Sequence, residues 1–411
     1  ERDDSLSAKL RDSLPPPPSS SSIMLRYLKR SSSTLSSSHT RPAKRIKYTP
    51  LHPTNNLKIL SWNVNGLKAV TSKYEMEQED YSFAQQFITK DHSLDNLQYL
   101  LKKERPTILT LQETKIQKNQ QELYEWKFEG YQGFFCSSIK KKGYSGVAIF
   151  VRVDWMQQQK QHKNIRIKRG FLAKEQHDEG RLISLEFDEF IILNVYAPNS
   201  AAELKRLEYR MQWDRDLLAF IDELKEDTGK AVILTGDLNV SYLNLDVWNP
   251  EDRHPRTACW TQEEKDGFKT FINAGLVDSF RYLHPDKADS YSQWSYRARN
   301  KIQNRGMRLD YILMSDSLKE GLEAAYMMPG IKGSDHCPVG MNFKLPETYL
   351  QSLHVKQMHM EEEKALSHLT DEEKRQLKEA KDYAEDELLV NESRGDGSNQ
   401  AVQVETQDES E

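Results

Sequence analysis

The stretch Gly333-Ser334-Asp335-His336-Cys337-Pro338 places a carboxylate beside an imidazole, directly before the apolar residues 339–343. Adjacent Asp and His often only cap a turn, so the pair alone decides little. Four further polar clusters also end apolar runs: Asn63-Val64-Asn65, Gln112-Glu113-Thr114-Lys115, residues 194–199, and Asp237-Leu238-Asn239. Five strand ends that carry acids, amides and one histidine predict a single polar site at the edge of a sheet.

The apolar runs and helical periodicities predict the fold class. We expect strands at residues 57–65, 107–111, 147–151, 186–196, 231–234, 309–314 and 339–343, which end at Gly, Pro or polar residues. Helices are expected at 94–101, at 204–224, and from Thr261, which has the spacing of a capping box with Glu264. This mixed order predicts one α/β domain with two packed sheets flanked by helices.

Charge divides the chain of 411 residues into three parts. Residues 1–56 are rich in Ser and Pro and carry 10 Lys and Arg against 4 acids, whereas 361–411 carry 6 against 17. The residues between them carry 42 of each sign, so bulk charge does not argue that the core binds nucleic acid. We predict a disordered basic leader (1–56), a folded domain (57–345) and an acidic helical or disordered tail (346–411).

The sequence also bears on the compartment. No apolar run approaches the roughly 20 residues needed to cross a bilayer. The three cysteines lie far apart without CxxC spacing, which favours a reducing compartment over a disulfide framework. The leader has the character of an organelle transit peptide around 24–30 and of a nuclear-import cluster at 42–47, and a plain solvated basic tail is an equal alternative. We expect the nucleus, with a mitochondrion or another organelle as the alternative.

The carboxylates among the five clusters indicate a metal site. Glu113 and Asp335 are hard oxygen donors that, with the amide oxygen of Asn65 and with waters, suit Mg²⁺. Zinc fits less well, because the set offers one His and no nearby Cys. A metal-bound phosphate oxygen would lose charge, which eases attack at phosphorus.

The remaining polar residues suit hydrolysis. Asp237 with Asn239 could orient and deprotonate a water, and Asp310 could fix the tautomer of His336. Neutral donors for charge on a phosphate come from Tyr196, Asn199 and Asn63. Each residue has a plainer alternative, such as an Asx turn for Asp237, a surface position for Glu113 or a core-edge ring for Tyr196. Their coincidence at five strand ends favours a metal-dependent hydrolytic site.

In order along the chain, the motifs resemble a known family. They are Ser61-Trp62-Asn63-Val64-Asn65-Gly66-Leu67, Leu111-Gln112-Glu113-Thr114-Lys115, residues 143–148, residues 194–199, Arg206-Leu207-Glu208-Tyr209-Arg210, residues 235–240, Arg308-Leu309-Asp310-Tyr311 and residues 333–338. Over about residues 57–345 they are similar to the exonuclease III family of apurinic/apyrimidinic endonucleases, in the endonuclease/exonuclease/phosphatase superfamily. The strings LQETK, RLEYR and GSDHCP are typical of the repair branch rather than of the inositol-phosphate phosphatases or sphingomyelinases.

This resemblance implies a fold and an activity. The fold would be a four-layered, DNase I-like α/β sandwich. The activity would be Mg²⁺-dependent cleavage of double-stranded DNA on the 5′ side of an abasic site, leaving a 3′-hydroxyl, with Mn²⁺ able to substitute. 3′-phosphodiesterase and 3′→5′ exonuclease activities would accompany it. The protein would act in base-excision repair as a monomer without a membrane, with repair-protein partners recruited through the termini.

The resemblance also implies roles for individual residues. The metal would be held mainly by Glu113, with Asn65 and Asp335 nearby, and a wider set of ligands would include Asp237, Asn239 and His336. The catalytic residues would be Tyr196 near the leaving oxygen, Asp237 and Asn239 at the water, and Asp310 with His336 at the scissile phosphate. Contacts to DNA would come from Asn63, Lys115, Asn199, Trp294, Arg297 and Arg305.

Several positions depart from the family pattern. Asn65 stands where animal members carry Asp, so a second direct carboxylate ligand does not carry over. Ala201, Ala202 and Met307 replace residues that penetrate DNA in some members, so that role does not carry over either. The segment 295–308 is basic and acid-free, and we expect it along phosphates or, alternatively, as a solvated loop. The aromatic residues Tyr291, Trp294 and Tyr296 would line a pocket for an extruded sugar or belong to the core.

Two other functions compete with DNA repair. A phosphatase or phospholipase of the same fold would act on a small phosphoester, and it would not cleave an abasic duplex. A non-catalytic binding module would be expected to have lost ligands, yet all the acids and the His are present.

Overall fold

A computed structural model describes residues 56–71, 96–121, 124, 128–158, 165–171, 178–296 and 299–378. The predictions for the leader up to residue 55, for the acidic end from 379 and for Arg297 fall outside these residues. The predicted domain boundaries remain predictions.

Within the described residues, twelve strands form two mixed six-stranded sheets. The first sheet has the spatial order β11 (Leu322–Met327), β12 (Val339–Lys344), β1 (Asn56–Asn63), β2 (Ile108–Gln112), β4 (Val147–Arg152), β3 (Tyr131–Cys136). The second has the order β5 (Arg166–Arg169), β6 (Leu182–Glu186), β7 (Phe190–Tyr196), β8 (Ala231–Asp237), β10 (Asp310–Ser315), β9 (Leu276–Asp278). The two sheets confirm the expected α/β architecture.

Strand direction brings the polar clusters to one edge. The pair β1–β2 is parallel, and so is β7–β8, whereas the remaining pairs in each sheet are antiparallel. Parallel neighbours end at the same edge, so Asn63 pairs with Gln112 and Tyr196 with Asp237. The antiparallel strand β10 begins where β8 ends, with Asp310 opposite Asp237.

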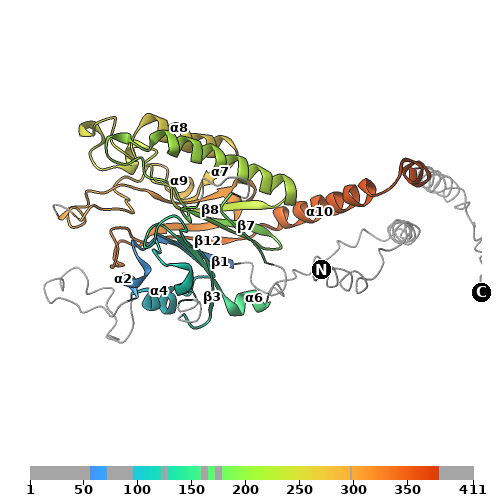
Figure 1. The fold of residues 1–411 in the computed structure, drawn as a ribbon, viewed down its shortest axis with the longest axis horizontal. Helices are drawn as coiled ribbons and strands as arrows, with labels where there is room; N and C mark the ends of the chain where they lie inside the picture. The colour runs from blue at the N-terminus through green and yellow to red at the C-terminus, as the bar shows by residue number, and fades with distance from the viewer. Residues whose placement is uncertain are drawn as a thin grey trace, which may run out of the picture. The chain divides into compact units, whose positions relative to one another are not determined.

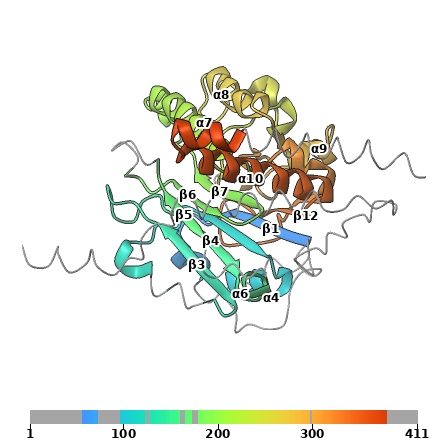
Figure 2. The same ribbon diagram turned by 90° about the vertical axis from the view of Figure 1, so that its right-hand side faces the viewer.

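The alternation of apolar side chains along the strands builds four layers (Figures 1 and 2). One face of each sheet packs on the other sheet, and that interface includes Ile59, Ile149, Ile192 and Ile233. The outer face of the first sheet is covered by α2 (Leu67–Val70) and α4 (Asn96–Glu104), and the outer face of the second by α7 (Leu207–Thr228) and α8 (Gln262–Asn273). This arrangement is the expected four-layered, DNase I-like sandwich.

Helix termini follow their local sequence. The predicted capping box of α8 is present, because Thr261 Oγ1 accepts from the Glu264 N–H and the Glu264 side chain accepts from the Thr261 N–H. Helix α7 ends at Gly229, whose φ of 69° suits glycine. The other helices are α6 (Val153–Gln158), α9 (Ser279–Leu283), α10 (Glu347–Ser367) and the short 3₁₀ turns η2 (Lys118–Gln120), η5 (Ala202–Leu204), η6 (Asn244–Asp246), η7 (Pro250–Asp252) and η9 (Asp316–Gly321).

Two segments differ in detail from the predicted elements. Residues 186–196 were expected to be one strand, but they contain the end of β6, a tight turn in which the Phe187 N–H donates to the Phe190 carbonyl, and β7. The tail expected from residue 346 begins with α10, whose Tyr349, Leu350 and Leu353 are buried in the core between the sheets. None of the helices in the described ranges is both long and apolar enough to span a membrane.

Candidate active site

The strand ends deliver the candidate residues through unusual backbone conformations. Asn65, Glu113, Lys115 and Asn239 have φ between 47° and 55°, in the left-handed region that costs non-glycine residues about 1 kcal/mol or more. The turn before Asp237 needs glycine, because a Cβ on Gly236 would lie 2.0 Å from the Val195 carbonyl oxygen. Such strained positions persist only where the surrounding structure holds them, and they gather at functional sites.

Asn63 lies at the centre of the site and links its two sides. Its amide nitrogen donates to Glu113 Oε1 at 3.1 Å and to Asp237 Oδ2 at 2.8 Å. Its amide oxygen accepts from the Asn65 N–H at 3.0 Å. The side-chain amide is fully buried, and its nitrogen and its oxygen both bond to residues of the site. Asn63 therefore fixes the position of Glu113, at the end of the first sheet, relative to Asp237, at the end of the second.

Glu113, Asn65 and Asp335 form an oxygen-rich corner of the site, and the Lys115 side chain contacts it. The Lys115 ammonium contacts Glu113 Oε2 at 3.1 Å and also donates to Asn65 Oδ1, while Asn65 Nδ2 donates to Asp335 Oδ1 at 2.9 Å. Burial alone would raise the pKa of Glu113, but the charge of Lys115 and the hydrogen bonds from Asn63 and Lys115 outweigh it and hold that pKa below its ordinary value. The corner thus already stabilises positive charge, and its hard oxygens fit a divalent cation.

His336 and two aspartates form a second, buried cluster. His336 Nδ1 lies 2.7 Å from Asp310 Oδ2, as expected, and His336 Nε2 lies 4.0 Å from Asp237 Oδ2. Burial alone would lower the pKa of His336, but Asp310, Asp237 and Asp335 raise it to about 10, so the imidazole is protonated at neutral pH. Burial and the charge of Asp310 raise the pKa of Asp237 to about 7, against the opposing charge of His336.

This second cluster also has the composition of a metal site. Asp237, Asp310 and His336 each offer a ligand atom, and the three atoms lie within 4.8 Å of one another. His336 Nδ1 is already hydrogen-bonded to Asp310, which favours a proton-holding role for this pair. The more open corner at Glu113 is the better cation site, because its side chain is 19% exposed whereas that of Asp310 is fully buried.

Similarity to known proteins agrees with this geometry. Residues 60–336 match the model of the Endonuclease/Exonuclease/phosphatase family. The chain belongs to this family. It is 41% identical over 283 residues to an exodeoxyribonuclease of Bacillus subtilis, an alignment that covers 69% of this chain and 98% of the relative. It is 36% identical over 286 residues to the DNA repair nuclease APEX1 of Danio rerio, covering 69% of this chain and 81% of that protein. These relatives place the chain in the exonuclease III branch of the family.

A solved structure supports the same assignment. The crystal structure of an AP endonuclease from Leishmania major is 26% identical to this nuclease and superposes with a TM-score of 0.58. The superposition covers 75% of this chain and 92% of that one. The nuclease therefore shares both the four-layered fold and its position in the family with enzymes that cut DNA.

On one side of Asp237, the nuclease holds two amides in place. The Asn239 N–H donates to Asp237 Oδ1 at 2.9 Å, and Asn239 Nδ2 donates to the Ala197 carbonyl at 2.9 Å. Asn199 Nδ2 donates to Asn239 Oδ1 at 3.0 Å and lies 3.1 Å from the sulfur of Cys259. The structure thus brings Asp237, Asn239 and Asn199 together as the sequence predicts.

Tyr196 closes the site on the side of β7. Its hydroxyl interacts with Glu113, and burial together with the charges of Glu113 and Asp237 raises the pKa of Tyr196 well above its ordinary value. The hydroxyl therefore keeps its proton and can donate to an anion. Tyr196 joins the group formed by Glu113 and Asp237 as the sequence predicts.

The predicted DNA contacts fall into two groups. Lys115 and Asn199 lie at the site, and Arg305 is exposed on the basic segment, where its guanidinium lies over the Trp248 ring. Trp294 is only 3% exposed and packs against Tyr291 and Cys337. The Trp294 indole donates to Asn304 Oδ1 at 3.1 Å, and this placement supports a structural role for Trp294 rather than direct DNA contact. Among the three aromatic residues considered for a sugar pocket, Tyr296 alone is exposed, at 71%.

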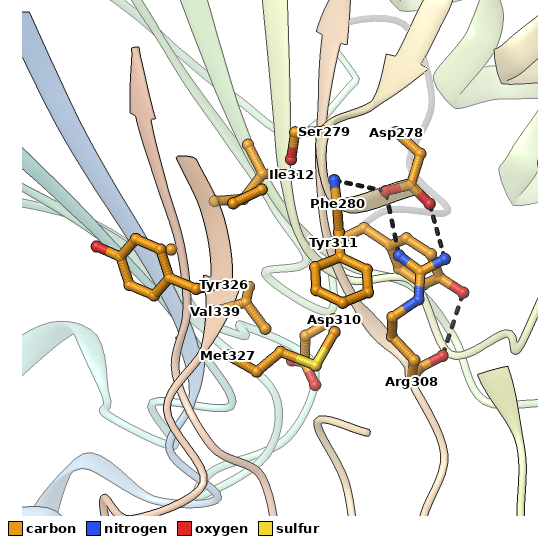
Figure 3. Close-up of a pocket in the computed structure, with 12 residues that line it drawn as sticks. Asp278, Ser279, Phe280, Arg308, Asp310, Tyr311, Ile312, Tyr326, Met327 and Val339 are labelled. Atoms are coloured by element: carbon orange, nitrogen blue, oxygen red, sulfur yellow. Dashed lines mark hydrogen bonds and ion pairs between the residues drawn. The ribbon is translucent and has the colours of Figure 1, made fainter. Parts of the chain in front are cut away.

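Arg308 does not lie along a phosphate path. Its guanidinium is buried and donates to both oxygens of Asp246 and both oxygens of Asp278, at 2.7–3.1 Å. Figure 3 shows the pair with Asp278. Arg308 and Asp310 line one small cavity together with Met327. The basic segment 295–308 thus ends in an internal ion-pair network that holds the beginning of β10.

Several positioning residues were not predicted from the sequence. Ser334 Oγ donates to the Asn63 carbonyl at 2.7 Å, the Trp62 indole donates to the His336 carbonyl at 3.1 Å, and Ser292 Oγ accepts from the Asp310 N–H at 3.0 Å. Trp62 and Ser334 lie inside the quoted motifs, so the motifs signalled them. Ser292 carries no such signal, because its partner is 18 residues away on another segment.

Proposed function

We propose that this nuclease is an abasic-site endonuclease of DNA base-excision repair that depends on Mg²⁺. It hydrolyses the phosphodiester 5′ to the lesion, leaves a 3′-hydroxyl, and also removes nucleotides or blocking groups from 3′ ends. The observation that carries the proposal is the Asn63 amide, which bonds Glu113 and Asp237 at once. A cation-binding carboxylate and a candidate base are thus held on either side of a single phosphate position.

Glu113 would hold the metal with Asp335 and the amide oxygen of Asn65, and Mn²⁺ could replace Mg²⁺ there. The position of the Lys115 ammonium against Glu113 and Asn65 supports this choice of ligands. When bound, the ion would draw charge from a phosphate oxygen. Asp237, Asn239 and His336 are buried more deeply than Glu113, and we propose proton and phosphate roles for them.

Asp237 would take a proton from the attacking water. Its raised pKa, near 7, matches a group that accepts a proton at neutral pH, and Asn63 and Asn239 hold its two oxygens in place. The water oxygen forms the new bond to phosphorus while the bond from phosphorus to the 3′-oxygen breaks, and the departing 3′-oxygen takes up a proton from the Tyr196 hydroxyl or from water. The products are a 3′-hydroxyl and a 5′-phosphate on the abasic residue.

Two donors would stabilise the charge on the phosphate. The imidazolium of His336, held by Asp310, presents its Nε2–H toward the phosphate position beside Asp237. Tyr196 keeps its hydroxyl proton and would donate to a phosphate oxygen or to the departing 3′-oxygen. Asn199 and Lys115 would line the DNA side of the same position.

The test is incision of a duplex that carries one tetrahydrofuran abasic analogue, with Mg²⁺ or with EDTA. The variants are Glu113→Ala and Asp237→Asn, and the matched control is Glu263→Ala, an exposed carboxylate on α8. We expect Mg²⁺-dependent nicking immediately 5′ to the analogue, reduced about 100-fold or more in both site variants and unchanged in the control.

Two outcomes would contradict the proposal. Absence of nicking by the folded wild type would favour a small phosphoester as substrate, which release of phosphate from inositol phosphates would reveal. Nicking that survives both EDTA and Glu113→Ala would exclude the metal site at Glu113.

For the cell, we propose that the segment 42–47 directs the chain to the nucleus, with residues 24–30 as a competing organelle address. The support is the sequence alone. A fluorescent fusion of the full chain should be nuclear and should become diffuse when the Lys and Arg of 42–47 are replaced by Gln. Mitochondrial fluorescence in the unaltered fusion would contradict the nuclear assignment.

A further inference from the structure

An exposed tryptophan, Trp248, lies outside every motif described above. Trp248 follows η6 and is 37% exposed, the largest aromatic side chain in the described residues with that degree of exposure. The guanidinium carbon of Arg305 lies 4.7 Å from the centre of its ring. An exposed indole paired with an arginine has the composition of a platform on which a nucleobase stacks.

The backbone connects this platform directly to the catalytic histidine. The Trp248 N–H donates to the Gly306 carbonyl at 2.9 Å, and its neighbour Val247 forms a bridge with Met307. Met307 in turn pairs with Gln293, and Gln293 pairs with His336. His336 and Val247 are thus separated by three bridges between neighbouring extended segments. At the usual spacing between paired strands, three bridges correspond to about 14 Å.

A second arginine, Arg253, contacts Met307, the residue that bridges to Val247 beside Trp248, and it has no acidic partner among the described residues. Within the described part of the chain, Arg253 and Arg305 form no ion pair, and the buried Nε of Arg253 has no hydrogen-bond partner. Among the described residues, the Arg253 guanidinium donates to the weak acceptor sulfur of Met307, at 3.5 Å. Asp252, on the same turn, accepts from Asn249 instead. Uncompensated arginines beside an exposed ring suit a strand that carries both phosphates and bases.

We propose that Trp248, with Arg253 and Arg305, forms a stacking subsite for an unpaired nucleobase of the DNA substrate. The proposal rests on the proposed function, and it adds a second contact to the scissile phosphate. A paired base keeps both faces covered within the duplex, so an exposed indole selects a base that has left its stack. An abasic lesion leaves one base without a partner, and a frayed 3′ end leaves another.

The first experiment measures binding without catalysis. The full chain in EDTA is titrated with three duplexes: unmodified, with one tetrahydrofuran, and with a mismatched 3′-terminal nucleotide, and tryptophan fluorescence is followed. We expect quenching with the lesion or mismatch duplex that is lost in Trp248→Phe, because the indole of Trp248 is the proposed stacking surface for the base. Equal quenching in wild type and Trp248→Phe would overturn the proposal.

The second experiment measures incision of the tetrahydrofuran duplex and excision of the mismatched 3′ nucleotide. Trp248→Ala should raise KM about tenfold for the substrate whose unpaired base stacks on Trp248, and it should change kcat less. Trp248→Phe should keep most of the affinity, because it retains an aromatic ring. The two duplexes thus distinguish the orphaned base from the frayed one. Tyr282→Ala, an exposed aromatic near Lys319 beyond the far end of β10, is the matched control and should retain wild-type KM.

Arg253→Ala and Arg305→Ala should each reduce the dependence of binding on salt by about one unit of slope. A KM within twofold of wild type for Trp248→Ala on both duplexes would overturn the proposal, and thermal melting would show that the variant is folded. If wild type fails to nick the tetrahydrofuran duplex while Trp248 is still quenched, the proposed incision fails and the stacking subsite stands.

Discussion

The guanidinium carbon of Arg181 lies 4.5 Å from the centre of the Tyr196 ring. Arg181 is 4% exposed, and its three nitrogens donate to Glu179 Oε2 at 2.6 Å, to the Tyr196 carbonyl at 3.0 Å and to the Tyr144 hydroxyl at 2.6 Å. Arg206 binds the other side of Glu179 at 3.1 Å. Arg181 therefore fixes the ring and the backbone of Tyr196 from behind the site, without touching the phosphate position.

We predict that Arg181→Lys lowers the rate of incision about tenfold and changes the affinity for DNA less than twofold. A lysine cannot make the three planar contacts that orient Tyr196, although it keeps the charge. Single-turnover incision and DNA binding in EDTA measure the two quantities separately. A change in affinity alone would identify Arg181 as a DNA contact instead.

A double-mutant cycle supplies the control for this positioning role. If Arg181 acts through Tyr196, then Arg181→Lys should have little further effect in a Tyr196→Phe background. Additive losses in the two variants would show that Arg181 acts through another residue. Lys205 is an exposed cation next to Arg206 in the sequence, and Lys205→Ala should leave the rate of incision unchanged.

The second prediction concerns pH and His336. Its folded-state pKa, about 10, lies above the ordinary value of 6.5, so protonated His336 stabilises the metal-free fold below pH 6.5. That contribution, on the order of 5 kcal/mol at most, is lost as the pH rises from 6.5 through about 10. Urea unfolding of wild type and His336→Gln in EDTA should show a stability difference that narrows across this range. A difference that is constant from pH 6 to pH 10 would show that the pKa of His336 is not raised.

The strand ends were predictable because their signal is local. An apolar run that stops at Asp237-Leu238-Asn239 or at Glu113 shows both the strand and the polar residue that it delivers. The order of parallel and antiparallel neighbours then brings Asn63, Asp237 and Asp310 to one edge. The family resemblance supplied the roles, and the hydrogen bonds among these residues agree with a shared site.

The rest was not predictable because it depends on distant partners or on weak patterns. Arg181 meets Tyr144 across 37 residues, and Trp248 meets Arg305 across two segments that show no apolar periodicity. Strand β5 is a short edge strand of four residues, Arg166–Arg169, with exposed ends and no apolar run. The turn between β6 and β7 contains Asp188 but no Gly or Pro, so two strands were expected as one.

The third prediction tests the cation corner. The Lys115 ammonium contacts both Glu113 and Asn65, so it competes with a bound metal for the same oxygens. We expect Lys115→Met to lower the Mg²⁺ concentration for half-maximal incision several-fold, while the maximal rate falls because a phosphate contact is lost. Incision across a Mg²⁺ titration measures both quantities. An unchanged or higher Mg²⁺ requirement would place the metal away from Glu113.

The last prediction concerns the ion-pair network behind β10. Arg308 is buried between Asp246 and Asp278, and Arg281 also donates to Asp246. Arg308→Met should destabilise the fold by about 3–5 kcal/mol, because it leaves buried carboxylates short of a partner. Since Arg308 lies two residues before Asp310, any remaining folded protein should also incise more slowly.

Urea unfolding measures the loss of stability, and Arg299→Met, an exposed arginine of the same basic segment, is the matched control. The double variant Arg308→Met with Asp278→Asn should recover part of the stability, because it removes one of the buried charges that Arg308→Met leaves unpaired. If Arg308→Met were as stable as wild type but bound DNA more weakly, Arg308 would belong to the DNA-binding surface. Its ion pairs with Asp246 and Asp278 would then exist only in the absence of DNA.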